Sequence, residues 1–199
     1  MNYPNTIKNL IECFKKFPGI GEKTAERMAL ATLEMPDEIL NLFSASIKDV
    51  KIKIKKCDRC GNLTENDLCQ ICIDESRNKK TLCVVEESKN VVLFEKIGTY
   101  NGIYHVLGGL ISPLDGINPE DINLDSLLKR IKEEEINEVI IAVKPSIEGE
   151  TTALYIRKML EGQNVIVSKI AHGIPMGADM EYIDPLTLEL ALEDRTTIS

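Results

Sequence analysis

The chain has 199 residues, of which 43% are hydrophobic and 28% charged, so it can bury one substantial core and one or two small modules. No eighteen apolar residues run together and the first twelve lack a signal peptide's apolar stretch, so we expect neither a membrane-spanning nor a secreted protein. The net charge of −8 is uneven: residues 1–56 carry 10 Lys and Arg against 7 Asp and Glu, and residues 57–199 carry 14 against 25. A polyanion is therefore expected to bind the first quarter of the molecule.

Two helices joined by a tight turn are predicted first. Apolar residues recur at helical spacing from Ile7 to Phe17, the sequence Pro-Gly-Ile-Gly at 18–21 interrupts them, and a second helix follows from Glu22 to Leu30. We interpret this pattern as a helix-hairpin-helix, a module that binds nucleic-acid backbone without reading sequence. The alternative is a plain helical turn with ordinary surface charges.

The chemistry of this turn suits a phosphate. Gly19 and Gly21 let the backbone come close, and the free N–H groups at the start of the second helix would face the ligand. Lys23 and Arg27, four residues apart, add positive charge. We therefore predict these four residues as the DNA-binding site.

A third helix is expected from Met35 to about Val50, with a buried side made of Ile39, Leu40, Leu42, Phe43 and Ile47. The following segment, 51–56, alternates lysine and isoleucine before ending in two lysines. That period of two predicts an extended strand with Ile52 and Ile54 facing inward. Its lysines fit either a protected sheet edge or a role in attracting DNA.

Four cysteines follow as two C-x2-C pairs, Cys57 with Cys60 and Cys69 with Cys72, separated by eight residues. This spacing predicts a structural site for one Zn²⁺, closed because protein thiolates fill all four positions. Two disulfides, an iron centre or free thiols are the alternatives. A reducing cytoplasm is the expected compartment and favours metal over disulfides.

Two cysteines and both histidines lie outside this cluster. Cys13 and Cys83 have apolar neighbours and are expected to be small buried hydrophobic residues. His105 and His172 lack a partnered Cys, Ser or Asp pattern, so each is expected to form structural hydrogen bonds.

From residue 81 onward, predicted strands alternate with helices. Short apolar strands between amphipathic helices indicate a mostly parallel sheet covered on both faces, an α/β fold. The expected strands are 81–85, 103–106, 138–143 and 164–168, and the expected helices are 88–96, 124–134, 150–161 and 185–192. Function in such sheets gathers at the carboxyl ends of strands, where two acidic sets follow: Glu86 with Glu87, and Glu148 with Glu150.

The order of these parts resembles the RecR family of bacterial recombination mediators over almost the whole chain. The strings that carry the resemblance, besides the turn and the cysteine pairs, are VVE at 84–86, YHVLGG at 104–109, ISPLDG at 111–116, EGETTALY at 148–155 and AHGIPMG at 171–177. The corresponding modules are 1–56 (helix-hairpin-helix), 57–72 (four-cysteine zinc finger), 73–78 (linker), 79–175 (Toprim domain) and 176–199 (a C-terminal strand or helix segment for assembly).

The resemblance implies a role in recombinational repair of DNA damage. It implies partnership with RecO, and in some bacteria RecF, to help load RecA onto single-stranded DNA coated by single-strand-binding protein. It further implies a ring-like homo-oligomer, expected to be a tetramer, that binds single- and double-stranded DNA in the cytoplasm at the nucleoid.

The sequence departs from the pattern of catalytic Toprim enzymes in one respect that bears on activity. Toprim enzymes pair a glutamate after the first strand with a D-x-D motif after a later one, because several carboxylates must hold Mg²⁺ against a phosphate. Glu86 fills the first place, but the second lacks D-x-D and carries Lys144 where relatives more usually have Asn. We therefore expect a protein that is not an enzyme, with Glu86, Glu148 and Glu150 forming at most a weak Mg²⁺ or partner-docking site. The alternative is a Mg²⁺-dependent Toprim-type nuclease or primase-like enzyme.

Overall fold

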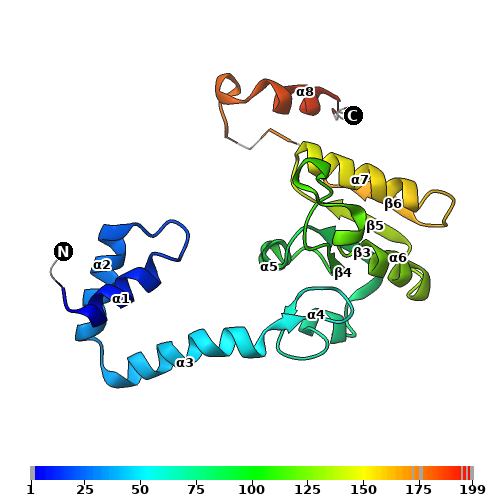
Figure 1. Ribbon diagram of the computed structural model, residues 1–199. Helices are drawn as coiled ribbons and strands as arrows, with labels where there is room; N and C mark the ends of the chain where they lie inside the picture. The colour runs from blue at the N-terminus through cyan, green and yellow to red at the C-terminus, as the bar shows by residue number, and fades with distance from the viewer. Residues whose placement is uncertain (1–2, 172, 175–176, 194, 196, 198–199) are drawn as a thin grey trace. The chain divides into compact units, whose positions relative to one another are not determined.

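A computed structural model describes residues 3–171, 173–174, 177–193, 195 and 197 (Figure 1). The chain divides into two compact units, Met1–Ile54 and Lys55–Ser199, and each is described by itself. His172 and part of the string at 171–177 lie outside the described residues. Among the helices of the described residues, none combines the length and apolar character needed to cross a membrane.

The first unit is helical. It contains α1 (Asn5–Phe14), α2 (Glu22–Ala31), a 3₁₀ turn (Thr32–Glu34) and α3 (Asp37–Lys53). Its core is a cluster of buried residues, Ile11, Phe14, Ala25 and Ala29, with Tyr3, Ile7, Leu10, Ile20 and Met28 packed around them. The two alanines are almost fully buried, and their small side chains let α1 and α2 pack closely across the predicted turn.

Helix α3 differs from both predictions made for this region. None of its residues is buried, and Ile39, Leu42, Phe43 and Ile47 are all exposed, so the predicted buried side is wrong for the single chain. The predicted strand at 51–56 is also wrong, because the helix continues to Lys53 and leaves Ile52 78% exposed.

The sequence explains why the helix continues. Lys51 and Lys53 lie in its last turn, where cations interact favourably with the helix dipole. Lys53 Nζ also pairs with Asp49 at 2.6 Å, one helical turn earlier. Of the predicted strand only Lys55–Lys56 forms one: it is β1, which pairs antiparallel with β2 (Leu63–Thr64).

The second unit confirms the predicted parallel sheet. Strands β3 (Asn78–Val85), β4 (Gly102–Val106), β5 (Glu138–Ala142) and β6 (Ile166–Lys169) are hydrogen-bonded in the order β4-β3-β5-β6, with every pair parallel. Helices α5 (Ser88–Ile97), α6 (Leu124–Glu133) and α7 (Ile147–Met159) accompany it, close to their predicted bounds. The last predicted helix is α8 (Pro185–Glu193), which buries no residue.

Alternation along β3 shows how the two faces are covered. Leu82 and Val84 belong to the larger core cluster together with Leu127 of α6 and Ile156 of α7. The intervening Cys83 and Val85 join a second cluster that contains Val91 of α5. Because successive side chains of a strand point to opposite faces, all four are buried only when helices cover both faces.

The register of the sheet aligns the carboxyl ends of its central strands. Val85 of β3 lies opposite Val106 of β4 and Ala142 of β5. The residues that follow these strands, including Glu86 and Lys144, therefore begin at one edge of the sheet.

Candidate nucleic-acid interface and metal centre

The turn between α1 and α2 is open to a ligand. Gly19 has a φ of +80°, a left-handed conformation that favours glycine, and the Ile20 N–H donates to the Phe17 carbonyl at 3.2 Å. A Cβ atom added at Gly19 or Gly21 would meet nothing within 4 Å. The backbone can therefore be approached closely at both glycines.

Gly21 is the N-cap of α2 and offers no side chain to bind the first N–H groups of the helix. Its carbonyl accepts the first helical hydrogen bond, from the Ala25 N–H at 2.9 Å. The N–H groups that precede Ala25 in the helix have no carbonyl of their own helix to bind, and with the helix dipole they favour an anion.

Lys23 and Arg27 are exposed on α2, one helical turn apart. Within the described residues neither side chain forms an ion pair or a hydrogen bond, whereas Lys15 pairs with Glu12 at 2.8 Å and with Glu22 at 2.7 Å. Hydrogen bonds to Glu12 and then Glu22 raise the pKa of Lys15, which stays charged and offsets the acid nearest the turn. The structure thus places the four predicted residues on one turn and the helix that follows it.

The four predicted zinc ligands converge in the second unit. Cys57, Cys60, Cys69 and Cys72 are all buried, and their sulfur atoms lie within 4.8 Å of one another. They are the one group of three or more candidate metal ligands found in the described part of the chain. Four thiolates about 2.3 Å from a tetrahedral Zn²⁺ would lie about 3.8 Å apart, and Cys60 Sγ is 3.6 Å from Cys69 Sγ.

The backbone holds these thiols in place. The Cys69 N–H donates to Cys57 Sγ at 3.3 Å, and Gly61, with a φ of +74°, turns the chain after the first pair. Hydrogen bonds from the neighbouring thiols, first that of Cys60 and then that of Cys72, lower the pKa of Cys69. The donor set, its burial and its spacing fit one structural Zn²⁺, which would be held by all four side chains.

The zinc segment packs against the end of β4. The Val106 N–H donates to the Cys60 carbonyl at 2.8 Å, and a Cβ atom at Gly61 would lie 2.9 Å from the Val106 carbonyl oxygen. Arg59, between the first two ligands, lies 3.7 Å from Glu134, which also accepts a 3.1 Å hydrogen bond from buried Arg130. The metal centre is therefore built onto the sheet through backbone and side-chain contacts.

Two of the three predicted acidic residues, Glu86 and Glu150, are each paired with a lysine. Lys144 Nζ lies 3.8 Å from Glu86 Oε1, and Lys169 Nζ lies 3.0 Å from both carboxylate oxygens of Glu150. Glu148 accepts a 2.7 Å hydrogen bond from Ser146, which lowers the pKa of the Glu148 carboxyl. The three carboxylates do not form a metal-ligand cluster of the kind that the cysteines form.

The remaining cysteines and histidine differ in their surroundings. Cys83 is buried as predicted, and burial raises the pKa of its thiol to about 12. Cys13 is exposed, so its predicted burial is wrong: on α1 the core-facing positions are Ile11 and Phe14. His105 is fully buried, and its Nε2 lies 2.7 Å from the Asn123 carbonyl oxygen, a structural contact of the predicted kind.

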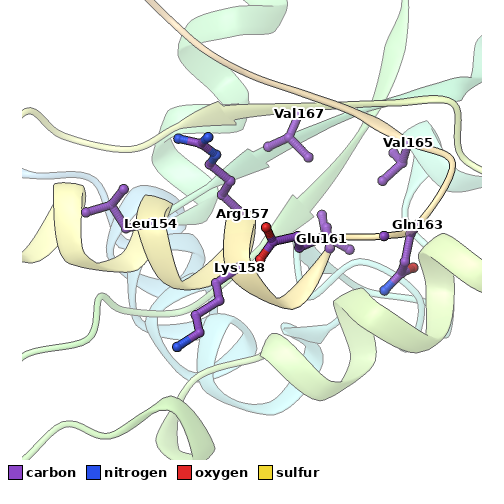
Figure 2. Close-up of a pocket in the computed structure, with 9 residues that line it drawn as sticks. Leu154, Arg157, Lys158, Glu161, Gln163, Val165 and Val167 are labelled. Carbon is purple, nitrogen blue, oxygen red and sulfur yellow. The ribbon is translucent and has the colours of Figure 1, made fainter.

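One surface of the sheet was not anticipated from sequence. A hollow of about 590 Å³ lies between the end of α7 and strand β6, and Figure 2 shows Arg157 and Lys158 on the helix with Val165 and Val167 on the opposite side. The sequence carried one indication of this surface: Arg157 and Lys158 are adjacent basic residues near the end of the helix predicted at 150–161. β6 is one of the two edge strands of the four-stranded sheet that the structure describes.

Models of known families match successive segments of the chain. They are described as RecR helix-hairpin-helix (residues 7–51), RecR four-cysteine zinc finger domain (54–74), Toprim domain (80–171) and RecR C-terminal (173–196). The two site segments, the turn before α2 and the four cysteines, each fall inside one of these matches.

Similar proteins match over nearly their full length. Recombination protein RecR from Staphylococcus aureus strains JH9, Newman and COL is 46% identical to this chain over 196 residues. The match covers 98% of this chain and 99% of each relative.

Proposed function

This chain belongs to the RecR family of recombination proteins, and we propose that it is a DNA-binding mediator of recombinational repair. In this proposal it acts with RecO, and where present RecF, to help load RecA onto single-stranded DNA coated by single-strand-binding protein. It binds single- and double-stranded DNA through the backbone, without sequence preference, at the nucleoid.

The observation that carries the DNA-binding part is the turn before α2. Gly19 and Gly21 leave the backbone open, no side chain caps the N–H groups of the first turn of α2, and the side chains of Lys23 and Arg27 have no partner in the described residues. Each feature favours a phosphate, and none of them reads a base.

The test reverses the two charges. Lys23→Glu/Arg27→Glu should lower affinity for labelled single-stranded DNA roughly tenfold or more at low salt. If each side chain contacts one phosphate, the log–log slope of affinity against salt should become shallower by about 1.4. Fluorescence anisotropy at several salt concentrations measures both quantities.

A matched control carries the same change of charge elsewhere. Lys129→Glu/Lys132→Glu alters two exposed lysines of α6 in the acidic unit and should leave DNA affinity within about twofold. Equal losses in both variants would mean that net charge, and not the turn, governs binding.

We also propose that Zn²⁺ maintains the connection between the hairpin module and the Toprim domain. The first ligand, Cys57, follows β1 directly, and the Cys60 carbonyl accepts a hydrogen bond from the end of β4. When bound, the ion would supply folding energy to this segment and no chemistry, because the four thiolates leave no open position.

A third proposal is a ring-like homo-oligomer, a tetramer. Two exposed apolar surfaces support it: one side of α3 and the leucines of α8, of which Leu186 is 61% and Leu192 66% exposed. Contiguous exposed apolar residues commonly mark a protein interface. Several hairpin modules in one assembly would raise effective concentration on DNA without new contacts.

Sedimentation velocity tests this assembly. Leu42→Lys/Ile47→Lys on α3 should shift the oligomer toward smaller species, because α3 contributes nothing buried within one chain. If the unaltered protein sediments as a monomer at every concentration tested, the proposed ring is contradicted.

For Glu86, Glu148 and Glu150 we propose a partner-docking role and no catalysis. Lys144 and Lys169 lie beside two of these carboxylates and would compete with Mg²⁺ for them. Plasmid DNA incubated with the protein and Mg²⁺ should stay intact. Nicking that disappears in Glu86→Ala would instead support the nuclease or primase-like alternative.

A further inference from the structure

The loop of residues 112–121, here called the acidic loop, has a fixed backbone. The Ser112 N–H donates to the Ile117 carbonyl and the Ile117 N–H to the Ser112 carbonyl, both at 2.9 Å. Inside this bridge the Asp115 N–H donates to the Ser112 carbonyl at 3.0 Å, and Ser112 Oγ donates to the Asp115 carboxylate at 2.6 Å. Gly116 closes the turn with a φ of +73°.

Both ends of the acidic loop are attached to the core. Ile111, just before it, is buried, and its N–H donates to Thr152 Oγ1 of α7 at 2.9 Å. Ile122, just after it, is also buried, and Asn118 and Asp121 cap the short turn between them. The loop therefore displays its tip from a defined position.

The tip carries Leu114, whose side chain is 100% exposed. Singly exposed apolar residues are common on proteins, and exposure alone implies nothing. Leu114 differs because it is fully exposed on a backbone held by hydrogen bonds at both ends. Its side chain contributes no buried surface to the folding of one chain, so folding does not explain a leucine here.

The charge along the chain around this loop indicates the kind of partner, and Lys56 is the one basic residue that lines the same hollow as Asp121. No lysine or arginine occurs from residue 97 to residue 128, and Asp115, Glu120, Asp121 and Asp125 fall within that stretch. Glu120, Asp121 and Asp125 are exposed. DNA would be repelled here, whereas a protein surface with lysine or arginine around an apolar pocket would be attracted.

We propose that the acidic loop is a protein-docking element that inserts Leu114 into an apolar pocket rimmed by basic residues. A pre-organised loop loses little conformational freedom on binding, so burial of one leucine is not offset by the cost of ordering the loop. Within the proposed function the partner is RecO, and this inference rests on that partnership. The acidic loop would bind protein while the turn before α2 binds DNA.

The experiment measures binding of purified RecO from the same organism to the full-length chain by isothermal titration calorimetry. Leu114→Ser should weaken binding at least tenfold, and Glu120→Gln should weaken it less, with a shallower dependence on salt. Leu93→Ser on α5 is the matched control, since that leucine is 57% exposed outside the acidic loop, and it should stay within twofold of the unaltered protein.

Three further measurements separate the outcomes. DNA affinity and melting temperature should be unchanged in Leu114→Ser, because its side chain is fully exposed. Unaltered RecO affinity in Leu114→Ser overturns this inference alone, whereas no RecO binding by the unaltered protein overturns the proposed partnership and the inference with it. A smaller oligomer for Leu114→Ser in sedimentation would place the loop between copies of this chain and would also overturn the inference.

Discussion

The two units of this chain differ in how much of their apolar surface they bury. The sheet of the second unit is covered on both faces, and all four residues from Leu82 to Val85 are buried. In the first unit the core consists of Ile11, Phe14, Ala25 and Ala29, while the whole of α3 lies outside it. A small module with so little buried surface is marginal alone, which is a physical argument for the proposed assembly with other copies.

The units also differ in charge. The first unit, Met1–Ile54, has 8 Lys and Arg against 7 Asp and Glu, whereas the second, Lys55–Ser199, has 16 against 25. The small unit therefore repels a polyanion far less than the large one, which is an acidic scaffold suited to basic protein partners and contains the metal centre. Three predictions test this division.

The largest effect is expected at the metal centre. Cys60→Ser should lose zinc and destabilise the Lys55–Ser199 unit by several kcal/mol, since structural zinc binding in small fingers is worth about 10–16 kcal/mol. Zinc content per chain and thermal unfolding by circular dichroism, with and without chelator, measure the loss. Cys13→Ser, at an exposed cysteine, is the control. A metal-free preparation as stable as the zinc-loaded protein would contradict the structural role.

Next is the core of the first unit. Phe14→Ala should cost about 3–5 kcal/mol there, because it removes the largest side chain of a small core. DNA affinity should fall while zinc content stays at one ion per chain. Phe17→Ala, at a residue 55% exposed, should cost roughly 0.5 kcal/mol or less. Loss of zinc in Phe14→Ala would show that the two units do not fold independently.

The third prediction concerns the pH dependence of the second unit. Burial lowers the pKa of His105 to about 4, from an ordinary value of 6.5. Between these values the unfolded chain binds a proton that the folded chain does not, so stability is full above pH 6.5 and falls as pH drops toward 4. The loss attributable to His105 is about 3 kcal/mol.

His105→Gln isolates this contribution. Its free energy of unfolding, measured in urea from about pH 4 to 7, should depend less steeply on pH than that of the unaltered protein. Comparison of the two slopes removes the contribution of carboxylates that titrate in the same range. Identical slopes would mean that His105 is not held neutral by burial.

Several parts of the fold and site could be predicted because they depend on neighbours in sequence. The alternation of short apolar strands with amphipathic helices predicted the parallel sheet, and two C-x2-C pairs predicted the metal centre. Where two local patterns compete, sequence is ambiguous: Lys51-Ile52-Lys53-Ile54 alternates like a strand, yet its lysines also suit the end of a helix. The exposure of α3 could not be predicted, since periodicity shows an apolar side but not what covers it.

Residue type and spacing alone specify the glycines of the turn at 18–21, the four-thiol ligand set and the acidic character of residues 57–199. Which charges meet depends instead on the tertiary structure. Lys144 is 58 residues from Glu86 in the chain, yet the parallel register of β3 and β5 brings the two together. Lys169 of β6 is 19 residues from Glu150, and these two pair across a strand and helix α7. The tertiary structure also decided that Leu114 lies fully in solvent, because side-chain exposure depends on contacts between residues distant in sequence.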